Sequence, residues 1–169
     1  MIQVYTGNGK GKTTAALGLA FRACGHSKKV IMIQFMKGDI EYGEITASKK
    51  LDGFSIHQFG LPTFVKKGEP SPEDLRLAKA GFDFAKKTIT ETKHDIVILD
   101  EINVAIDYGL IELDDLLKLL NDVPSDMEII LTGRYANPAI LERSDLVTEM
   151  REIKHPYIKG VAAREGIEF

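Results

Sequence analysis

A short apolar strand that runs into a glycine-rich turn and then a helix constrains the fold of this chain more than any other segment. Residues 2–5 read IQVY, residues 6–14 read TGNGKGKTT, and a helical run continues from Ala15. In such a unit the N–H groups of the turn and of the helix N-terminus converge on an anion, a lysine adds charge, and a hydroxyl reaches Mg²⁺. The pattern therefore predicts a phosphate-binding loop for a nucleoside triphosphate.

The loop departs in one place from the common sequence of phosphate-binding loops. The common form, G-x-x-x-x-G-K-[ST], begins with a glycine where this chain has Thr6, and a second lysine, Lys10, precedes Lys12. Alternating glycines still permit positive φ and close backbone approach. A strand before and a helix after favour a nucleotide site over an ordinary β–α turn with incidental lysines. The residues expected to contact the nucleotide are Gly7, Asn8, Gly9, Lys10, Gly11, Lys12, Thr13 and Thr14.

Strand-like and helix-like segments alternate along the chain, which is typical of a parallel sheet with helices on both faces. Residues 30–35 (VIMIQF) form the continuous apolar run of a buried strand, whereas 54–59 alternate as a half-buried strand does. Other strands are expected at 95–100, 128–132 and 146–150, and helices at 14–24 (with Gly25 as C-cap), 72–89, 113–120 and 138–143. A length of 169 residues suits one α/β domain spanning 1–169.

The helix predicted from residue 72 has the clearest start signal, because Ser71 can cap it and Pro72 suits its first position. Apolar residues recur along it at helical spacing and are expected to face the core. These residues are Leu75, Ala78, Phe82, Ala85 and Ile89.

Charge and composition exclude several classes of partner. A net charge of −3 argues against a broad nucleic-acid-binding face, and the single cysteine, Cys24, rules out an internal disulfide. No apolar run approaches the roughly 20 residues that span a bilayer, and the first residues already build a strand where a leader would stand. We therefore expect a cytoplasmic protein with no nucleic-acid or membrane partner.

An acid pair follows the apolar run at 96–99, and Asp100-Glu101 resembles the carboxylate end of a Walker B strand. Such carboxylates arrive beside a phosphate loop, where Mg²⁺ needs oxygen ligands. Thr13 and Glu101 are the expected metal ligands, although Glu101 could instead activate water. Arg134 could complement phosphate charge or be an ordinary surface arginine. The histidines His57, His94 and His155 are scattered without metal-ligand spacing and are interpreted as structural.

Two segments are expected to border the ligand because they follow strands at the carboxyl edge of the sheet. The first runs from Gln34 through Lys37 to Glu44. The second, residues 60–68, is a loop by its Gly and Pro content but carries Leu61 and Phe64. These apolar side chains either contact a large apolar ligand or fold back onto the core.

Several segments together resemble the corrinoid adenosyltransferases of the CobA/BtuR/CobO type. They are TGNGKGKTTAA (6–16), IQFMKG (33–38), ILDEIN (98–103), LTGR (131–134), SDLVTEM (144–150) and KHPYIKGVAAREGIEF (154–169). The resemblance runs almost end to end, and it implies a P-loop NTPase (RecA-like) three-layer sandwich with a mostly parallel central sheet. It also implies an enzyme that transfers the 5′-deoxyadenosyl group of ATP to the cobalt of cob(I)alamin or a related corrinoid.

In that reaction reduced cobalt attacks C5′ of ATP and triphosphate leaves, so no protein base is required. The resemblance then makes Lys12, Lys10 and Glu101 catalytic through positioning and charge stabilisation, with the triphosphate lying in the loop in reverse sense. It implies that Phe64, with Leu61 nearby, contacts the corrinoid. Arg22 is the candidate for recognising the adenine base. It further implies a homodimer and a flavoprotein-type reductase. Relatives can carry an N-terminal extension as a lid, so closure here is expected from another segment, a partner subunit or the corrinoid.

Two other functions stay open from the residues alone. One is a RecA-like ATPase or kinase in which Glu101 activates water or an acceptor. The other is a regulatory module that binds ATP without chemistry. The three differ in their products: adenosyl transfer releases intact triphosphate, an ATPase makes ADP and phosphate, and a sensor makes neither.

Overall fold

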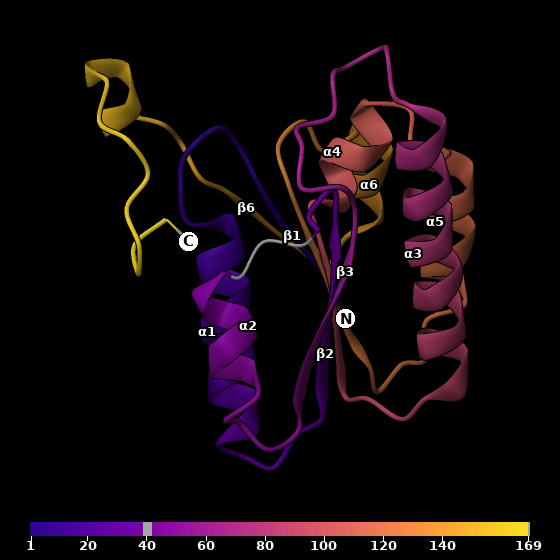
Figure 1. Ribbon diagram of the computed structural model, residues 1–169. Coiled ribbons are helices and arrows are strands. Elements are labelled where there is room, and N and C mark those ends of the chain that lie inside the picture. The colour runs from indigo at the N-terminus through magenta and orange to yellow at the C-terminus, as the bar shows by residue number, and fades with distance from the viewer. Residues whose placement is uncertain (39–41, 169) are drawn as a thin grey trace.

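The computed structural model describes residues 1–38 and 42–168, and it places a parallel sheet at the centre of the molecule (Figure 1). The strands lie in the order β3-β2-β4-β5-β1-β6, and every pair of neighbours is parallel. Their bounds are β1 Ile2–Thr6, β2 Val30–Phe35, β3 Phe54–Phe59, β4 Ile96–Asp100, β5 Glu128–Thr132 and β6 Leu146–Glu149. The α/β class and the strands predicted from apolar runs are therefore confirmed.

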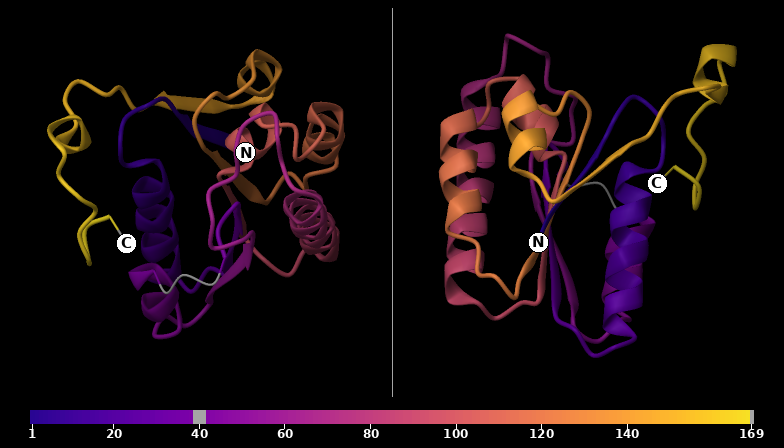
Figure 2. Two further views of the ribbon diagram at one scale, coloured as in Figure 1. Left: turned by 45° about the horizontal axis from the view of Figure 1, so that its top comes forward. Right: turned by 180° about the vertical axis from the view of Figure 1, so that it is seen from behind.

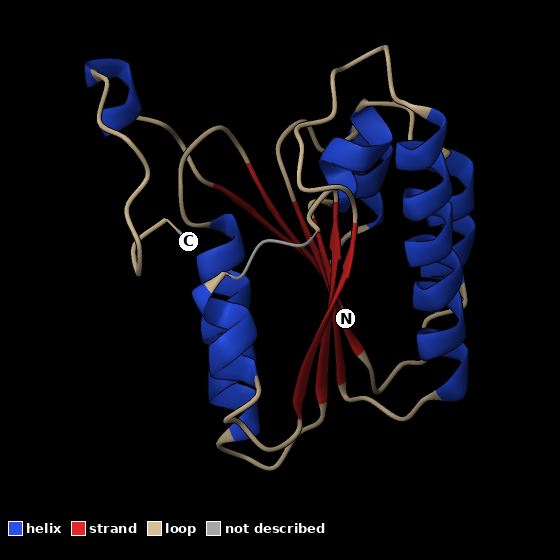
Figure 3. Cartoon of the chain, viewed as in Figure 1, coloured by secondary structure: helices blue, strands red, loops and turns tan. Residues whose placement is uncertain are grey.

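Helices cover both faces of the sheet and make the three layers expected of a RecA-like sandwich (Figures 1 and 3). One face carries α1 (Lys12–Cys24) and α2 (Gly43–Ser48). The other carries α3 (Pro72–Glu91), α4 (Ile102–Asp107), α5 (Leu113–Asn121) and α6 (Pro138–Arg143). After β6 the chain leaves the body, forms a short 3₁₀ helix at Pro156–Lys159, and returns towards the start of α1 (Figure 2).

The core lies in two layers, one on each side of the sheet. Under α1 it contains Ala16 and Ala20 against Met32, Ile98 and Ile130. Under α3 to α6 it is larger, with members such as Ile33, Leu99, Phe82, Leu116 and Ile140. Strands β2 and β4 are buried at every residue because they have neighbours on both edges and helices on both faces. Edge strand β6 is exposed throughout.

The structure corrects several details of the helices. The first helix begins at Lys12, two residues earlier than predicted, with Gly11 as N-cap at φ 117°. Ser71 caps α3 as predicted, and Asp74 completes a capping box, but Leu75 is 41 % exposed. The first turn of α3 stands beyond the ends of the strands, so its core face begins at Ala78 (Figure 1). Helices α2 and α4 were not predicted, because six residues are too few for a periodic pattern and neither has a start signal like the Asn137-Pro138 of α6.

The parallel arrangement brings the segments that follow β1, β2, β4 and β5 to a single edge of the sheet. These segments include the phosphate loop, the Lys37 region, the acid pair and the Gly133-Arg134 turn. Parallel sheets bind ligands at this edge. Residues 39–41, part of the first predicted segment, lie outside the described residues. Among the helices that the structure describes, none is long and apolar enough to cross a membrane.

Candidate functional site

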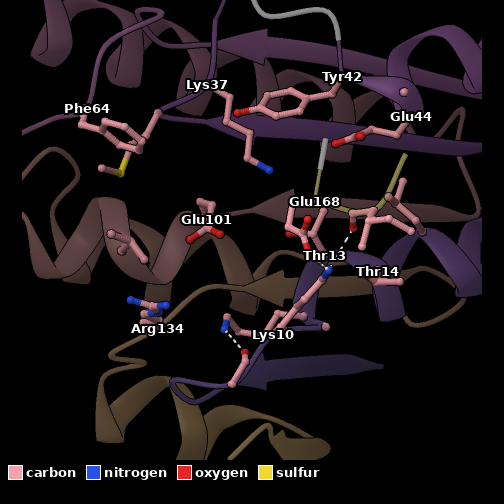
Figure 4. Close-up of a pocket in the computed structure, with 18 of the residues that line it drawn as sticks. Lys10, Thr13, Thr14, Lys37, Tyr42, Glu44, Phe64, Glu101, Arg134 and Glu168 are labelled. Carbon is pink, nitrogen blue, oxygen red and sulfur yellow. Dashed lines mark hydrogen bonds and ion pairs between the residues drawn. The ribbon is translucent and has the colours of Figure 1, made fainter. Parts of the chain in front are cut away.

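A cavity of about 680 Å³ opens at the carboxyl edge of the sheet (Figure 4). It is bordered by the phosphate loop, the segments after β2 and β4, the 60–68 loop, the turn after β5 and the end of the tail. Lining residues that recur below are Gly9, Lys10, Lys12, Thr13, Lys37, Tyr42, Phe64, Glu101, Arg134 and Glu168. Its volume falls within the usual range for small-molecule sites.

The backbone of the phosphate loop is held in place by the chain that follows β6. The Gly9 N–H donates to the Met150 carbonyl at 2.6 Å, and a Cβ on Gly9 would lie 2.7 Å from that oxygen. Gly7 and Gly11 have φ of 93° and 117°, which L side chains rarely adopt. Both constraints require glycine, so the glycine spacing read from the sequence has a structural cause.

Lys12 lies inside this loop. Its Nζ donates to the carbonyls of Gly7 and Gly9, at 2.8 and 2.6 Å, and the residue is only 8 % exposed. Burial lowers the pKa of the Lys12 ammonium, while nearby Glu101 opposes that change. The loop thus places a lysine at the position where the sequence predicts that an anion binds.

Asp100 at the end of β4 accepts four hydrogen bonds. Its Oδ1 accepts from Thr13 Oγ1 at 2.8 Å and from Thr132 Oγ1 at 2.7 Å. Its Oδ2 accepts from Lys37 Nζ at 2.8 Å and from Gln34 Nε2 at 3.1 Å. Burial opposes ionisation of Asp100, but Lys37 and these hydrogen bonds outweigh it and lower its pKa.

Glu101 follows in the left-handed conformation, at φ 62°, and its side chain reaches the cavity. Its N–H donates to Thr132 Oγ1 at 3.0 Å, which ties the turn after β4 to β5. Burial, followed by the charge of Asp100, raises the pKa of the Glu101 carboxyl. A cation bound beside the two carboxyl groups would favour the ionised form of Glu101 and so lower its raised pKa.

These donors fit a magnesium ion. Thr13 Oγ1, Asp100 and Glu101 offer hard oxygen atoms beside the phosphate loop, the ligand type that Mg²⁺ prefers. No group of three or more His, Cys, Asp or Glu side chains within residues 1–38 and 42–168 could enclose a metal by itself. A cation with few protein ligands, completed by phosphate oxygens and water, matches this donor set.

The opposite rim of the cavity is more apolar. Phe64 is fully exposed at the rim, while its neighbour Val65 packs against the core. Contact between Phe64 and a large apolar ligand stays a prediction. Figure 4 shows Phe64 at the same rim as Lys37 and Tyr42, across from Arg134.

Not every predicted site residue reaches the cavity. Asn8 and Leu61 do not line it, and neither does Gly7, whose carbonyl faces Lys12 instead. Arg22 lies in the last turn of α1, exposed, and about 15 Å along the helix axis from Lys12 at 1.5 Å per residue. The expectation that Arg22 reads the base has no support in this geometry.

Sequence reasoning missed several residues of the site. Thr132 is one of them, because its hydrogen bond to Asp100 depends on the sheet order. His155, interpreted as structural, lines the cavity together with Glu168 from the tail. The tail carries no hydrophobic periodicity that would have placed it there.

Comparison with known proteins agrees with this geometry. The family model described as "ATP:corrinoid adenosyltransferase BtuR/CobO/CobP" matches residues 1–169. Relatives named corrinoid adenosyltransferase include one from Pseudomonas aeruginosa (35 % identical; 100 % of this chain, 83 % of the relative) and one from Escherichia coli K12 (36 %; 100 % and 85 %). A solved KaiC-like protein from Pyrococcus horikoshii shares the fold, with a TM-score of 0.58 at 15 % identity over 90 % of this chain and 72 % of that one. The match over the full length shows that the chain belongs to the ATP:corrinoid adenosyltransferase family.

Proposed function

We propose that this protein transfers the 5′-deoxyadenosyl group of ATP to the Co(I) centre of a reduced corrinoid and releases triphosphate. The observation that carries the proposal is one cavity with two unlike walls. Lys12 and the loop N–H groups form an anion-binding wall, and exposed Phe64 forms an apolar rim. A triphosphate fits the first wall and a large corrin ring the second.

The chemistry needs positioning more than proton transfer. Co(I) supplies an electron pair to C5′, the C5′–O bond breaks, and its electrons leave with the triphosphate. No proton has to move in this step, which suits a cavity whose carboxyl groups accept hydrogen bonds or would bind a metal ion. The protein's contribution is to hold C5′ and cobalt in line and to stabilise the charge that develops on the leaving oxygen.

Positive charge for that leaving group comes from the phosphate loop. Lys12 lies at its centre and Lys10 at its outer edge, and Arg134 lines the cavity from the turn after β5. Mg²⁺, which Thr13, Asp100 and Glu101 would hold, supplies further charge at the triphosphate. In this role Glu101 is a metal ligand and not a general base.

The apolar rim is the proposed contact for the corrinoid. Phe64 would pack against the corrin, since an exposed aromatic ring at the mouth of a cavity gains by covering an apolar face.

Exposed edge strand β6, with Leu146 and Val147 about half exposed, offers one surface for a homodimer. A flavoprotein-type reductase would deliver the electron that forms Co(I).

The decisive experiment identifies the products. The protein is incubated with ATP, Mg²⁺ and chemically reduced cobalamin, the corrin spectrum is followed, and the phosphates are separated by ion exchange. We expect a light-sensitive adenosylated corrinoid and intact triphosphate in equal amounts. ADP and phosphate without a change in the corrin spectrum would favour the ATPase alternative, in which Glu101 activates water.

A further inference from the structure

Asp100 has no free acceptor position. A carboxylate offers about four lone-pair sites, and here four donors occupy them: Thr13, Thr132, Gln34 and Lys37. A cation that binds Asp100 directly must therefore displace one donor.

The four donors differ in how easily they can leave. Gln34 and Thr132 are fully buried on neighbouring strands, and Thr13 lies at the start of α1 within the loop. Lys37 stands on a flexible four-carbon stem, and its side chain is 19 % exposed while that of Asp100 is 0 % exposed. Figure 4 shows its ammonium pointing into the cavity from the rim that carries Tyr42.

The charges also favour exchange at this donor. A buried carboxylate needs a counter-ion, and Lys37 is the cation that contacts Asp100 among the described residues. A divalent ion at the same carboxylate would repel that ammonium. The ring of Tyr42, 5.6 Å from Nζ, offers the displaced cation a cation–π contact within the cavity.

We propose that Lys37 and Mg²⁺ are alternative counter-ions of Asp100, and that metal binding moves the Lys37 ammonium onto the triphosphate leaving group. Lys37 would then contact substrate, as an addition to the two loop lysines. The inference deepens the proposed function and rests on it for the identity of the anion.

The proposal predicts effects of opposite sign for one substitution. In Lys37→Gln the resident cation is gone, so Mn²⁺ alone, used as a probe for Mg²⁺, should bind about tenfold more tightly or better. Inorganic tripolyphosphate at saturating Mg²⁺ should bind about tenfold more weakly, because one charge-assisted contact is lost. Isothermal titration measures both affinities without corrinoid, and Lys93→Gln, an exposed change far from the cavity, is the matched control.

A purely structural ion pair would behave differently. If Lys37→Gln weakens Mn²⁺ binding or leaves it unchanged, or leaves tripolyphosphate binding unchanged, the proposal is wrong. Should Lys37→Gln fail to fold, Lys37→Arg decides: the guanidinium keeps the charge, and its rigid planar fork of five donors is displaced from Asp100 less easily, so Mn²⁺ binding should weaken. Equal Mn²⁺ affinities for Lys37→Arg and wild type would overturn it. Because neither titration contains corrinoid, a failure of adenosyl transfer would be seen separately.

Discussion

Lys10 of the phosphate loop and Glu168 of the tail form an ion pair of 2.8 Å across 158 positions of sequence. The same ammonium donates to the carbonyl of Ile167 at 2.9 Å. The tail thus ends on the residue that the sequence assigns to the triphosphate, and Gly166, Ile167 and Glu168 form part of the cavity wall. Glu168 and a phosphate group would compete for the same lysine.

Removal of this competitor should tighten nucleotide binding. We expect Glu168→Gln to lower the dissociation constant for Mg-ATP by a few-fold at most, because exposed ion pairs contribute little. Isothermal titration of Mg-ATP into both proteins measures the change. Glu165→Gln, which neutralises a nearby tail carboxylate that does not line the cavity, should bind like wild type. Weaker binding by Glu168→Gln would mean that the tail assists the phosphates.

The pH dependence of that difference follows from the state of Glu168. Hydrogen bonds from Arg164 and Lys10 lower the pKa of its carboxyl to about 2. Because the pKa of the folded state lies below the ordinary value, the contact is fully present above that ordinary value and is lost only as the pH falls towards 2. The ratio of wild-type to Glu168→Gln affinities should stay constant between about pH 5 and 8. A ratio that falls towards one within this range would contradict the assignment.

The strands could be predicted closely from the sequence. The apolar run at Val30–Phe35 and the alternation at Phe54–Phe59 each match a strand to the residue, although edge strand β3 packs against both core layers and not against one alone. The phosphate loop could be predicted because its conformation demands glycine at fixed positions.

Contacts set by tertiary structure could not be predicted. The Lys10–Glu168 pair joins residues with no shared local pattern, and the left-handed turn at Glu101 occurs at a residue type that rarely adopts it. Arg22 is a different case, since helix geometry alone would have placed it far from the loop. Arg22 shares α1 with the loop residue Lys12 but lies at the opposite end of the helix.

The contact between Gly9 and the chain after β6 predicts that a single methyl group disables the loop. In Gly9→Ala the new Cβ would meet three backbone atoms of Met150 and Arg151 within 2.9 Å, and backbone cannot move aside cheaply. We expect Mg-ATP binding to fall by at least about tenfold, since loop amides must aim at the phosphates. Titration calorimetry tests this.

Gly18→Ala is the matched control, because nothing lies within 4 Å of a Cβ there. In the middle of α1 it should raise the free energy of unfolding by roughly 0.5–1 kcal/mol and leave ATP affinity unchanged. If both alanine variants bind ATP equally well, the packing argument for Gly9 is wrong.

Lys12 at the centre of the loop should be the largest single contributor to triphosphate binding. We expect Lys12→Ala to weaken Mg-ATP binding by about 10- to 100-fold, the usual effect of losing a hydrogen bond between charged groups. Turnover should fall at least as far. Lys79→Ala, an exposed change on α3, serves as control in the same titration and rate assay. Wild-type kinetics for Lys12→Ala would refute the phosphate-loop assignment.

Substitution of Phe64 should affect the corrinoid step of the proposed reaction without affecting ATP binding. Its ring is fully exposed at the cavity rim, so Phe64→Ala should change the free energy of unfolding by less than about 0.5 kcal/mol. We expect Mg-ATP affinity to persist while the rate of corrinoid adenosylation falls about tenfold, because an aromatic contact with the corrin is lost. Phe21→Ala removes another exposed ring, 67 % accessible on α1 away from the cavity, and should leave the rate intact. Titration calorimetry and the corrin spectrum follow the two steps separately, and equal losses in ATP binding and in corrinoid turnover would assign Phe64 to the structure of the loop.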